Sequence, residues 1–217
     1  MEVKSFPINE TAAILGLIAY LIGSIPSAVW IGKIFYSRDV REFGSHNAGA
    51  TNTFRVLGKT AGSIVLVLDV FKGVAAVSLS RLLNEQLSPD RLKLFEICLG
   101  FLATIGHVYP AFARFKGGKG VATLTGVAFA IFPIAALITL GIFFTIFLLT
   151  NYISLSSISS SLLFPLTAYL VYRSYPPIIY TTLLLFPLVV IYTHRTNIQR
   201  LLKGEESKMY LFKKKVS

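Results

Sequence analysis

The sequence predicts an all-α integral membrane protein with seven transmembrane helices, its N-terminus outside and its C-terminus in the cytoplasm. Of its 217 residues, 54% are hydrophobic and 14% are charged, whereas soluble domains carry about 25% charged residues. The mean hydropathy is +0.67, and apolar runs follow one another along the whole chain. We therefore expect residues 1–217 to form a single multi-pass membrane domain.

The net charge of +11 lies mostly in loops beside the apolar runs. Basic residues in that position favour lipid headgroups, anionic substrates and a fixed topology over nucleic acid. The single cysteine, Cys98, lies in an apolar run, which excludes an intrachain disulfide and a cysteine metal site. The first apolar run continues to Trp30 without a small-residue cleavage site, so we expect no cleavable signal peptide.

Five apolar runs predict five clear spans. We place them at about Thr11–Phe35, Thr60–Leu83, Leu92–Tyr109, Ser154–Tyr172 and Pro177–Tyr192. The first is long enough to cross about 30 Å of hydrocarbon. It contains Gly23-Ser24-Ile25-Pro26-Ser27, whose small residues allow either close helix packing or a kink. A polar loop, Ser37–Lys59, follows the first span, and an outer loop, Asn84–Arg91, follows the second.

The segment Val121–Thr150 is long, almost uncharged and interrupted by Pro133, and parity decides how often it crosses. The loop around Lys119 and the tail after Thr193, which includes Lys213–Lys215, are both basic, so the positive-inside tendency puts both in the cytoplasm. Because the two last spans already separate them, this segment must add an even number of crossings. We expect two short ones, folded near Pro133 as a broken or partly penetrating hairpin that protein must cover.

With this topology the polar groups gather at the cytoplasmic face. A transporter typically places its polar site near the membrane midplane, between discontinuous helices. An enzyme that joins a water-soluble substrate to a lipid-soluble one needs its groups at a single interface. The asymmetry favours an enzyme. A small transporter or channel for phosphorylated metabolites, and a non-catalytic scaffold of the lipid-synthesis machinery, are the alternatives.

The loop Gly106–Thr123 reads GHVYPAFARFKGGKGVAT and contains no acidic residue. In its Lys116–Gly120 block, KGGKG, the glycines let backbone N–H groups converge on an anion, and the lysines add charge that suits a phosphate. The sequence therefore predicts an anion cradle. The alternative is a cytoplasmic loop whose basic residues only set topology. The block is not a P-loop, because Lys119 is followed by glycine.

The first inner loop, Gly44–Asn52, is rich in small residues and in hydroxyl and amide donors. We expect Thr51 or Asn52 to cap the helix that carries Arg55. A helix N-terminus with an arginine nearby can bind a phosphate. The alternative is an ordinary turn rich in glycine and asparagine.

Asp69 and Lys72 lie three residues apart inside the second span and share a helix face. Asp69 is about 14 Å from the start of that span, and charges at such depth are costly unless they are paired or face a wet cavity. A structural ion pair and a role in positioning the floor of the site both stay open.

The histidines, His46, His107 and His194, show no catalytic or metal spacing. None has an aspartate five residues on, as a soluble-type acyltransferase signature requires. His107 reads as a helix-end residue satisfied by backbone groups. His194 and Asn197 form a donor pair on one face if the last helix continues past Thr193.

Four motifs occur in register: S-H-N-A-G-A-T-N-T-F-R from Ser45 to Arg55, Asp69-x-x-Lys72-Gly73, Gly106-His107-x-Tyr109-Pro110 with F-K-G-G-K-G-V-A-T from Phe115 to Thr123, and His194-Arg195-x-Asn197-Ile198-x-Arg200-Leu201. Together they resemble the bacterial acyl-phosphate-dependent glycerol-3-phosphate acyltransferases, which make lysophosphatidic acid. The resemblance covers roughly Leu21 to Glu205. One departure is His46, which stands where the family usually has glycine and either faces solvent or narrows the pocket mouth.

The resemblance implies a seven-span bundle in the bacterial inner membrane with its active site facing the cytoplasm. It implies glycerol-3-phosphate, acyl phosphate and membrane lipid as partners, and neither metal nor coenzyme A as cofactor. We expect a monomer that binds no nucleic acid. The departing phosphate oxygen would accept the hydroxyl proton while His194 and Asn197 orient the reacting groups; a histidine base is the alternative.

The resemblance also assigns residues. Those expected to be catalytic are Ser45, Lys119, His194 and Asn197. Those expected to bind substrate are Ser45, Asn47, Thr51, Arg55, Lys72, Lys116, Gly117, Gly118, Lys119, Gly120, Ser154 and His194. Among them, the backbone of the three glycines would hold the acyl phosphate.

Overall fold

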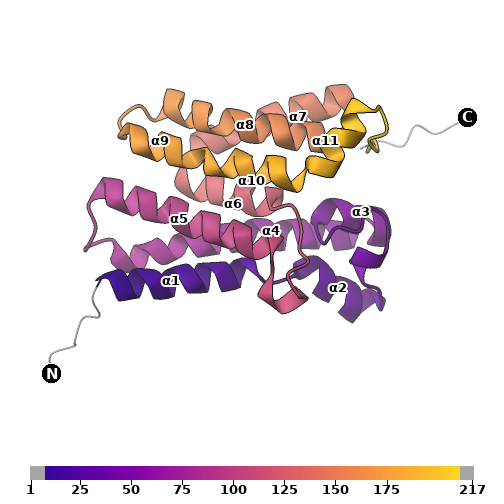
Figure 1. Ribbon diagram of the computed structural model, residues 1–217, viewed down its shortest axis with the longest axis horizontal. Coiled ribbons are helices and arrows are strands. Elements are labelled where there is room, and N and C mark those ends of the chain that lie inside the picture. Colours follow the sequence, from indigo (N-terminus) through magenta and orange to yellow (C-terminus); the bar gives the residue numbers. More distant parts are fainter. Residues whose placement is uncertain (1–7, 211–217) are drawn as a thin grey trace, which may run out of the picture.

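The structure is a computed structural model that describes residues 8–210, and all of its regular elements within that range are helices (Figure 1). They are α1 (Ile8–Gly23), α2 (Ser27–Tyr36), η1 (Val40–Glu42), α3 (Ala50–Leu57), α4 (Lys59–Ser78), η2 (Leu79–Leu83), α5 (Pro89–Val108), η3 (Ala111–Ala113), α6 (Val121–Ile131), α7 (Pro133–Thr150), α8 (Ile153–Val171), α9 (Pro177–Leu183), α10 (Leu185–Thr193) and α11 (Arg195–Leu202). Lys213–Lys215 of the basic tail lie outside the described residues.

Five segments of the described chain are long and apolar enough to cross a membrane: Asn9–Tyr36, Lys59–Leu83, Pro89–Ala113, Pro133–Thr150 and Ile153–Val171. The bent segment Pro177–Leu202 makes a sixth if its two parts count as one span. The protein is therefore an all-helical, multi-pass membrane protein, as the composition predicts.

The first predicted span is two helices rather than one. α1 ends at Gly23 and α2 begins at Ser27, because Pro26 has no N–H to continue the helical hydrogen bonds. The same small residues also allow close packing: a Cβ on Gly23 would overlap the carbonyl of Ala103 in α5. A Cβ on Gly106 would overlap the carbonyl of Tyr20. Both expected uses of this segment, packing and a break, are present.

The chain reverses at Pro133, where the sequence predicts a hairpin. α6 has 11 residues, and at its far end the Ile131 carbonyl lies 3.4 Å from Lys93 Nζ, near the start of α5. α7 then runs back antiparallel to α8, with Ile134 N–H bonded to Tyr172 Oη at 3.1 Å. Glycines again permit the packing, since a Cβ on Gly126 would overlap the Val70 carbonyl of α4.

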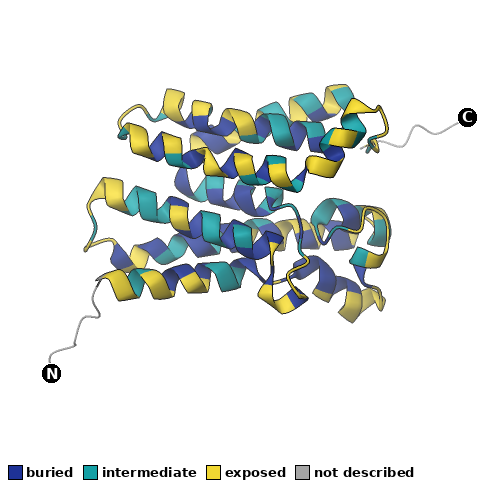
Figure 2. Ribbon diagram, viewed as in Figure 1, coloured by how far each residue is buried: buried dark blue, intermediate teal, exposed yellow. Residues whose placement is uncertain are grey.

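Most helices have both buried and exposed residues (Figure 2), and large apolar side chains occur both in the interior and on the outward faces. A buried cluster formed by α4–α10 includes Phe132, Ile179 and Leu183. Outward faces carry exposed side chains such as Leu148 and Leu149. Only 17% of the α7 span is buried, against 50% of the α5 span, so α7 is largely a lipid-facing helix that covers α8.

The loops between residues 37 and 49, the glycine-rich loop and α11 share one end of the bundle, on the right in Figure 1. The short connections after η2 and α8 lie at the other end. The polar residues predicted for the site therefore lie at one end of the bundle.

Candidate active site

Lys119 lies at the centre of a polar cluster at the loop end of the bundle. Its Nζ donates a hydrogen bond to Asn197 Oδ1 on α11, and its carbonyl oxygen accepts one from Thr193 Oγ1 at 3.1 Å. His194 is buried, and its Nδ1 lies 2.8 Å from the Val190 carbonyl oxygen. Because a carbonyl can only accept, Nδ1 carries the proton and Nε2 presents its lone pair when the ring is neutral.

This cluster depends on a bend in the last part of the chain. The helices before and after His194 differ in direction by 62°. A straight helix past Thr193, the condition under which His194 and Asn197 would share one face, is therefore not present. Because α11 turns across the end of the bundle, Asn197 meets Lys119 from the side.

Glu206 completes the cluster and was not predicted. Its carboxylate accepts hydrogen bonds from Ser154 Oγ at 2.7 Å, Asn197 Nδ2 at 2.6 Å and Arg200 Nε at 2.8 Å. The tail is tied down further by Met209, whose N–H donates to the Asn151 carbonyl at 2.9 Å. The only sequence signal was a pair of acidic residues inside an otherwise basic tail. The carboxylate thus occupies donors that an anionic substrate could also use.

The cluster also perturbs two ionisable groups. Burial lowers the pKa of Lys119 to about 8, with Glu206 opposing the shift and the charges of Arg200 and Arg55 adding to it. Burial would raise the pKa of Glu206, but hydrogen bonds from Arg200, Asn197 and Ser154 outweigh it, so that pKa lies below its usual range. At neutral pH the pair is therefore ionised.

The N–H groups of two glycines of the predicted cradle are hydrogen-bonded within the protein. The Gly117 N–H donates to the Val108 carbonyl at 3.2 Å, and the Gly118 N–H donates to the His107 carbonyl at 3.1 Å. A Cβ on Gly118 would overlap His107 Nε2. The expectation that these two N–H groups are free for an anion does not match this structure.

The third glycine opens a helix. Gly120 has φ +83° at the N-terminal end of α6, a conformation that favours glycine. No side chain of the described residues caps this N-terminus. The first N–H groups of α6 are therefore the part of the loop best suited to an anion.

The buried side chain of Asn52 holds the first inner loop in place through hydrogen bonds to its backbone. Its Oδ1 accepts the Ser45 N–H at 2.8 Å, and its Nδ2 donates to the carbonyls of Val40 and Phe43 at 2.8 and 3.1 Å. α3 begins after Gly49, so neither Thr51 nor Asn52 caps it, and that expectation is wrong. The buried amide instead shapes the loop.

The other predicted residues of this region surround the cluster less tightly. Ser45, Arg55 and Lys116 are exposed, while Asn47 and Thr51 are half-buried. Arg55 is close enough for its charge to act on Lys119. His46 faces solvent, with φ +56° and its Nδ1 3.0 Å from the Arg41 carbonyl, so it does not narrow the pocket.

Lys72 belongs to a second polar group, with Asp69 and His107. Its Nζ is 3.0 Å from Asp69 Oδ1 and donates to the Ile25 carbonyl at 3.0 Å. Both side chains are buried. His107 Nδ1 lies 3.7 Å from the same carboxylate oxygen and, within residues 8–210, has no hydrogen bond, so the expectation that backbone groups satisfy it is wrong. The three side chains line a small cavity together with Gly117 and Gly118.

A multi-pass helical bundle with a hydrogen-bonded polar cluster at one end defines a class: integral membrane proteins whose polar site lies at one face of the membrane. Within residues 8–210, no three His, Cys, Asp or Glu side chains are grouped to hold a metal. A sequence model of one family, glycerol-3-phosphate acyltransferase, matches residues 13–204. The chain belongs to this family.

Relatives and solved structures agree with that membership. The chain is 44% identical over 195 residues to a glycerol-3-phosphate acyltransferase of Staphylococcus carnosus, covering 89% of this chain and 95% of the relative. It is 46% identical over 198 residues to one of Listeria monocytogenes serovar 1/2a, covering 90% and 96%. Crystal structures of PlsY (YgiH), an integral membrane glycerol 3-phosphate acyltransferase, match with TM-scores of 0.81 for the glycerol 3-phosphate form and 0.79 for the lysophosphatidic acid form. Identity to these is 38% and 37%, over 92% of this chain and 96% and 95% of theirs.

Proposed function

We propose that this glycerol-3-phosphate acyltransferase, which forms lysophosphatidic acid, takes its acyl group from an acyl phosphate. The 1-hydroxyl oxygen of glycerol-3-phosphate attacks the acyl carbon, the bond from that carbon to the phosphate oxygen breaks, and inorganic phosphate leaves. The observation that carries the proposal is the junction of the Lys119 side chain with the uncapped N-terminus of α6. Two anions can be held together there.

The roles of the residues follow from their positions. Lys119 and the first N–H groups of α6 stabilise the acyl-phosphate oxygens. Arg55, Ser45 and Lys116 are exposed donors that can bind glycerol-3-phosphate. His194 Nε2, whose lone pair is fixed by the Val190 contact, orients the attacking hydroxyl, and the departing phosphate oxygen accepts the proton. Alignment of two bound reactants can supply about 7–11 kcal/mol of the barrier reduction.

An assay with purified protein tests the donor. Acyl phosphate and labelled glycerol-3-phosphate should yield labelled lysophosphatidic acid and inorganic phosphate in equal amounts. Turnover with acyl coenzyme A or acyl carrier protein but not with acyl phosphate would contradict the proposal. Flux of label across liposomes without product would instead support a transporter.

We infer seven crossings, with the N-terminus outside and the cluster on the cytoplasmic side of the bacterial inner membrane. The reversal at Pro133 and the shared end of the basic loops support this topology, and the protein acts as a monomer. With the native cysteine removed by Cys98→Ala, single cysteines are placed at exposed positions, Lys116→Cys beside the glycine loop and Arg195→Cys beside His194. Both should react with an impermeant maleimide in inside-out vesicles only. Reaction from opposite sides would contradict a shared site.

Turnover should fall as the pH rises through about 8, because the buried Lys119 ammonium, whose pKa is about 8, then loses its proton. Below that pH the charged form that holds the phosphate prevails. Lys119→Arg keeps its charge at any of these pH values. In that variant the decline should therefore vanish or move to higher pH, even if turnover is lower. A decline at the same pH in both proteins would assign it to another group.

A further inference from the structure

The side chain of Arg41, in the first inner loop, reaches the loop that carries Lys119. Its Nη1 donates to the Ala113 carbonyl oxygen at 3.0 Å and to the Lys116 carbonyl oxygen at 3.4 Å. These contacts join segments that are 72 and 75 residues apart in the sequence. None of the roles proposed for the reaction uses this arginine.

Asp39 fixes the direction in which the guanidinium of Arg41 points. Its two carboxylate oxygens accept hydrogen bonds from Nε at 2.9 Å and from Nη2 at 2.7 Å, the bidentate geometry typical of arginine and carboxylate. The side-chain hydrogen bonds from Arg41 hold the pKa of Asp39 well below its usual range, against the effect of burial, so the pair stays ionised. Because most of the five N–H donors of the guanidinium are used within the protein, Arg41 is placed to hold the loop rather than a substrate.

The two carbonyl groups that Arg41 holds flank a costly piece of backbone. Between them lie Arg114, with φ +56°, and Phe115, with φ +57°. This left-handed conformation is uncommon for residues other than glycine, and it persists only where the surrounding structure holds it. Arg41 therefore restrains the loop at the point where its backbone has most to gain by relaxing.

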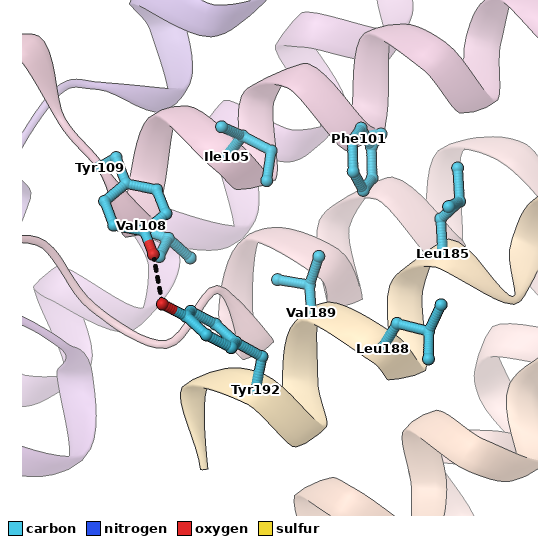
Figure 3. A pocket seen from close by; sticks show the side chains of 8 residues that line it. All are labelled: Phe101, Ile105, Val108, Tyr109, Leu185, Leu188, Val189 and Tyr192. Carbon is cyan, nitrogen blue, oxygen red and sulfur yellow. Dashed lines mark hydrogen bonds between the residues drawn. The ribbon is translucent and has the colours of Figure 1, made fainter. Parts of the chain in front are cut away.

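The end of α5 holds the next part of the same loop. The N–H groups of Gly117 and Gly118 donate to carbonyl oxygens of that helix. The end of α5 is tied in turn to α10, because Tyr109 Oη donates to Tyr192 Oη at 3.1 Å at one end of a mostly apolar pocket between the two helices (Figure 3). Helices α5 and α10 thus fix the two glycines, while the arginine holds Lys116, the residue before them.

We propose that Arg41, oriented by Asp39, is a positioning residue that sets Lys116 for the phosphate of glycerol-3-phosphate. This inference rests on the proposed function, in which Lys116 is one of the exposed donors for that substrate. Without the restraint, the lysine keeps its charge but must be ordered when the phosphate binds, which costs affinity. KM for glycerol-3-phosphate should therefore rise, while KM for acyl phosphate, which Lys119 and α6 hold, should change little.

Arg41→Lys and Arg38→Lys form a matched pair of variants. Both keep the positive charge, but lysine cannot make the bidentate contact or hold two carbonyls from one rigid plane. Arg38 is exposed, and its guanidinium lies over the Phe43 ring, 5.8 Å from the ring centre. Arg41→Lys should raise KM for glycerol-3-phosphate about 10-fold, the size of one charge-assisted hydrogen bond, and Arg38→Lys should keep the wild-type value. Equal KM values in the two variants would overturn the proposal.

A double-mutant cycle separates positioning from general damage. If Arg41 acts through Lys116, then Arg41→Lys in a Lys116→Ala background should raise KM for glycerol-3-phosphate by less than about 2-fold further. An effect that adds in full would show that the arginine acts elsewhere, and the proposal would fail. Asp39→Asn, which removes the charge that orients the guanidinium, is the second variant should Arg41→Lys not fold. It should raise the same KM, and again only when Lys116 is present.

Hydrogen exchange of the full-length protein in detergent tests the restraint without turnover. The peptide that spans residues 112–118 should exchange about 10-fold faster in Arg41→Lys than in the wild type, because the loop opens more often once a hydrogen bond is lost. Arg38→Lys should match the wild type, and α7 should be unchanged in both variants. Unchanged exchange of the loop in Arg41→Lys would show that the arginine does not hold it. A failed acyl-phosphate donor would leave this measurement intact, so the two proposals fail separately.

Discussion

Lys119→Ala is expected to lower turnover by about 10²–10³-fold, the effect of removing one preorganised donor from a transition state. The ammonium group donates to Asn197 Oδ1. Of the two arginines whose charges act on it, Arg200 is bonded to Glu206 instead and Arg55 is exposed, so we expect neither to replace the lost donor. The fold should survive. Burial lowers the pKa of this lysine, which means that its charged form is destabilised by the loss of water, and the alanine variant has no such charge to bury. The measurement is kcat and KM with thermal unfolding in the same detergent.

The matched control is Lys203→Ala, at an exposed lysine where α11 ends. It changes the net charge equally and should retain wild-type kinetics. If Lys119→Ala also kept full activity, the cluster would not be the active site. A variant that is inactive and unfolded would be compared with Lys119→Met, which retains the apolar stem of the side chain.

Asp69→Ala is expected to lower the free energy of unfolding by about 3–5 kcal/mol, because it leaves the Lys72 ammonium buried without its partner. The Nζ–Oδ1 distance of 3.0 Å and the burial of both side chains carry this expectation. Thermal or denaturant unfolding of the purified proteins measures it. A variant as stable as the wild type would show that the Ile25 carbonyl alone satisfies the lysine.

The double variant Asp69→Leu/Lys72→Met separates structure from chemistry. Replacing both charges by apolar groups of similar volume should restore most of the stability. If Lys72 only positions the glycine loop, the double variant should recover turnover together with stability. A stable double variant with a raised KM for either anionic substrate would instead give Lys72 the substrate contact that the resemblance implies.

Much of this arrangement could be predicted because it follows from local patterns. The apolar runs gave the spans, Pro133 marked the reversal, and the basic loops placed Lys119 near His194. Contacts between segments that are distant in the sequence could not be predicted in the same way. Nothing in the local sequence shows that the N–H groups of Gly117 and Gly118 are used by the end of α5, or that the chain bends by 62° at His194.

Glu206 was missed for a related physical reason. A tail rich in lysine and arginine reads as a solvated, topology-setting segment, and one carboxylate within it carries no periodic signal. Its role depends on the way the tail folds back. This brings Glu206 to Ser154, 52 residues earlier in the sequence, and to Asn197 on α11. The packing of the tail, not its composition, decides its function.

The brevity of α6 sets the depth at which the two substrates meet. Its 11 residues rise only about 16 Å, roughly half of the hydrocarbon thickness. Its first turn starts beside Thr104, since a Cβ on Gly120 would touch that side chain, and Thr104 precedes the last turn of α5. The reacting carbon can therefore stay within the leaflet, at a depth that glycerol-3-phosphate has to reach from the aqueous side.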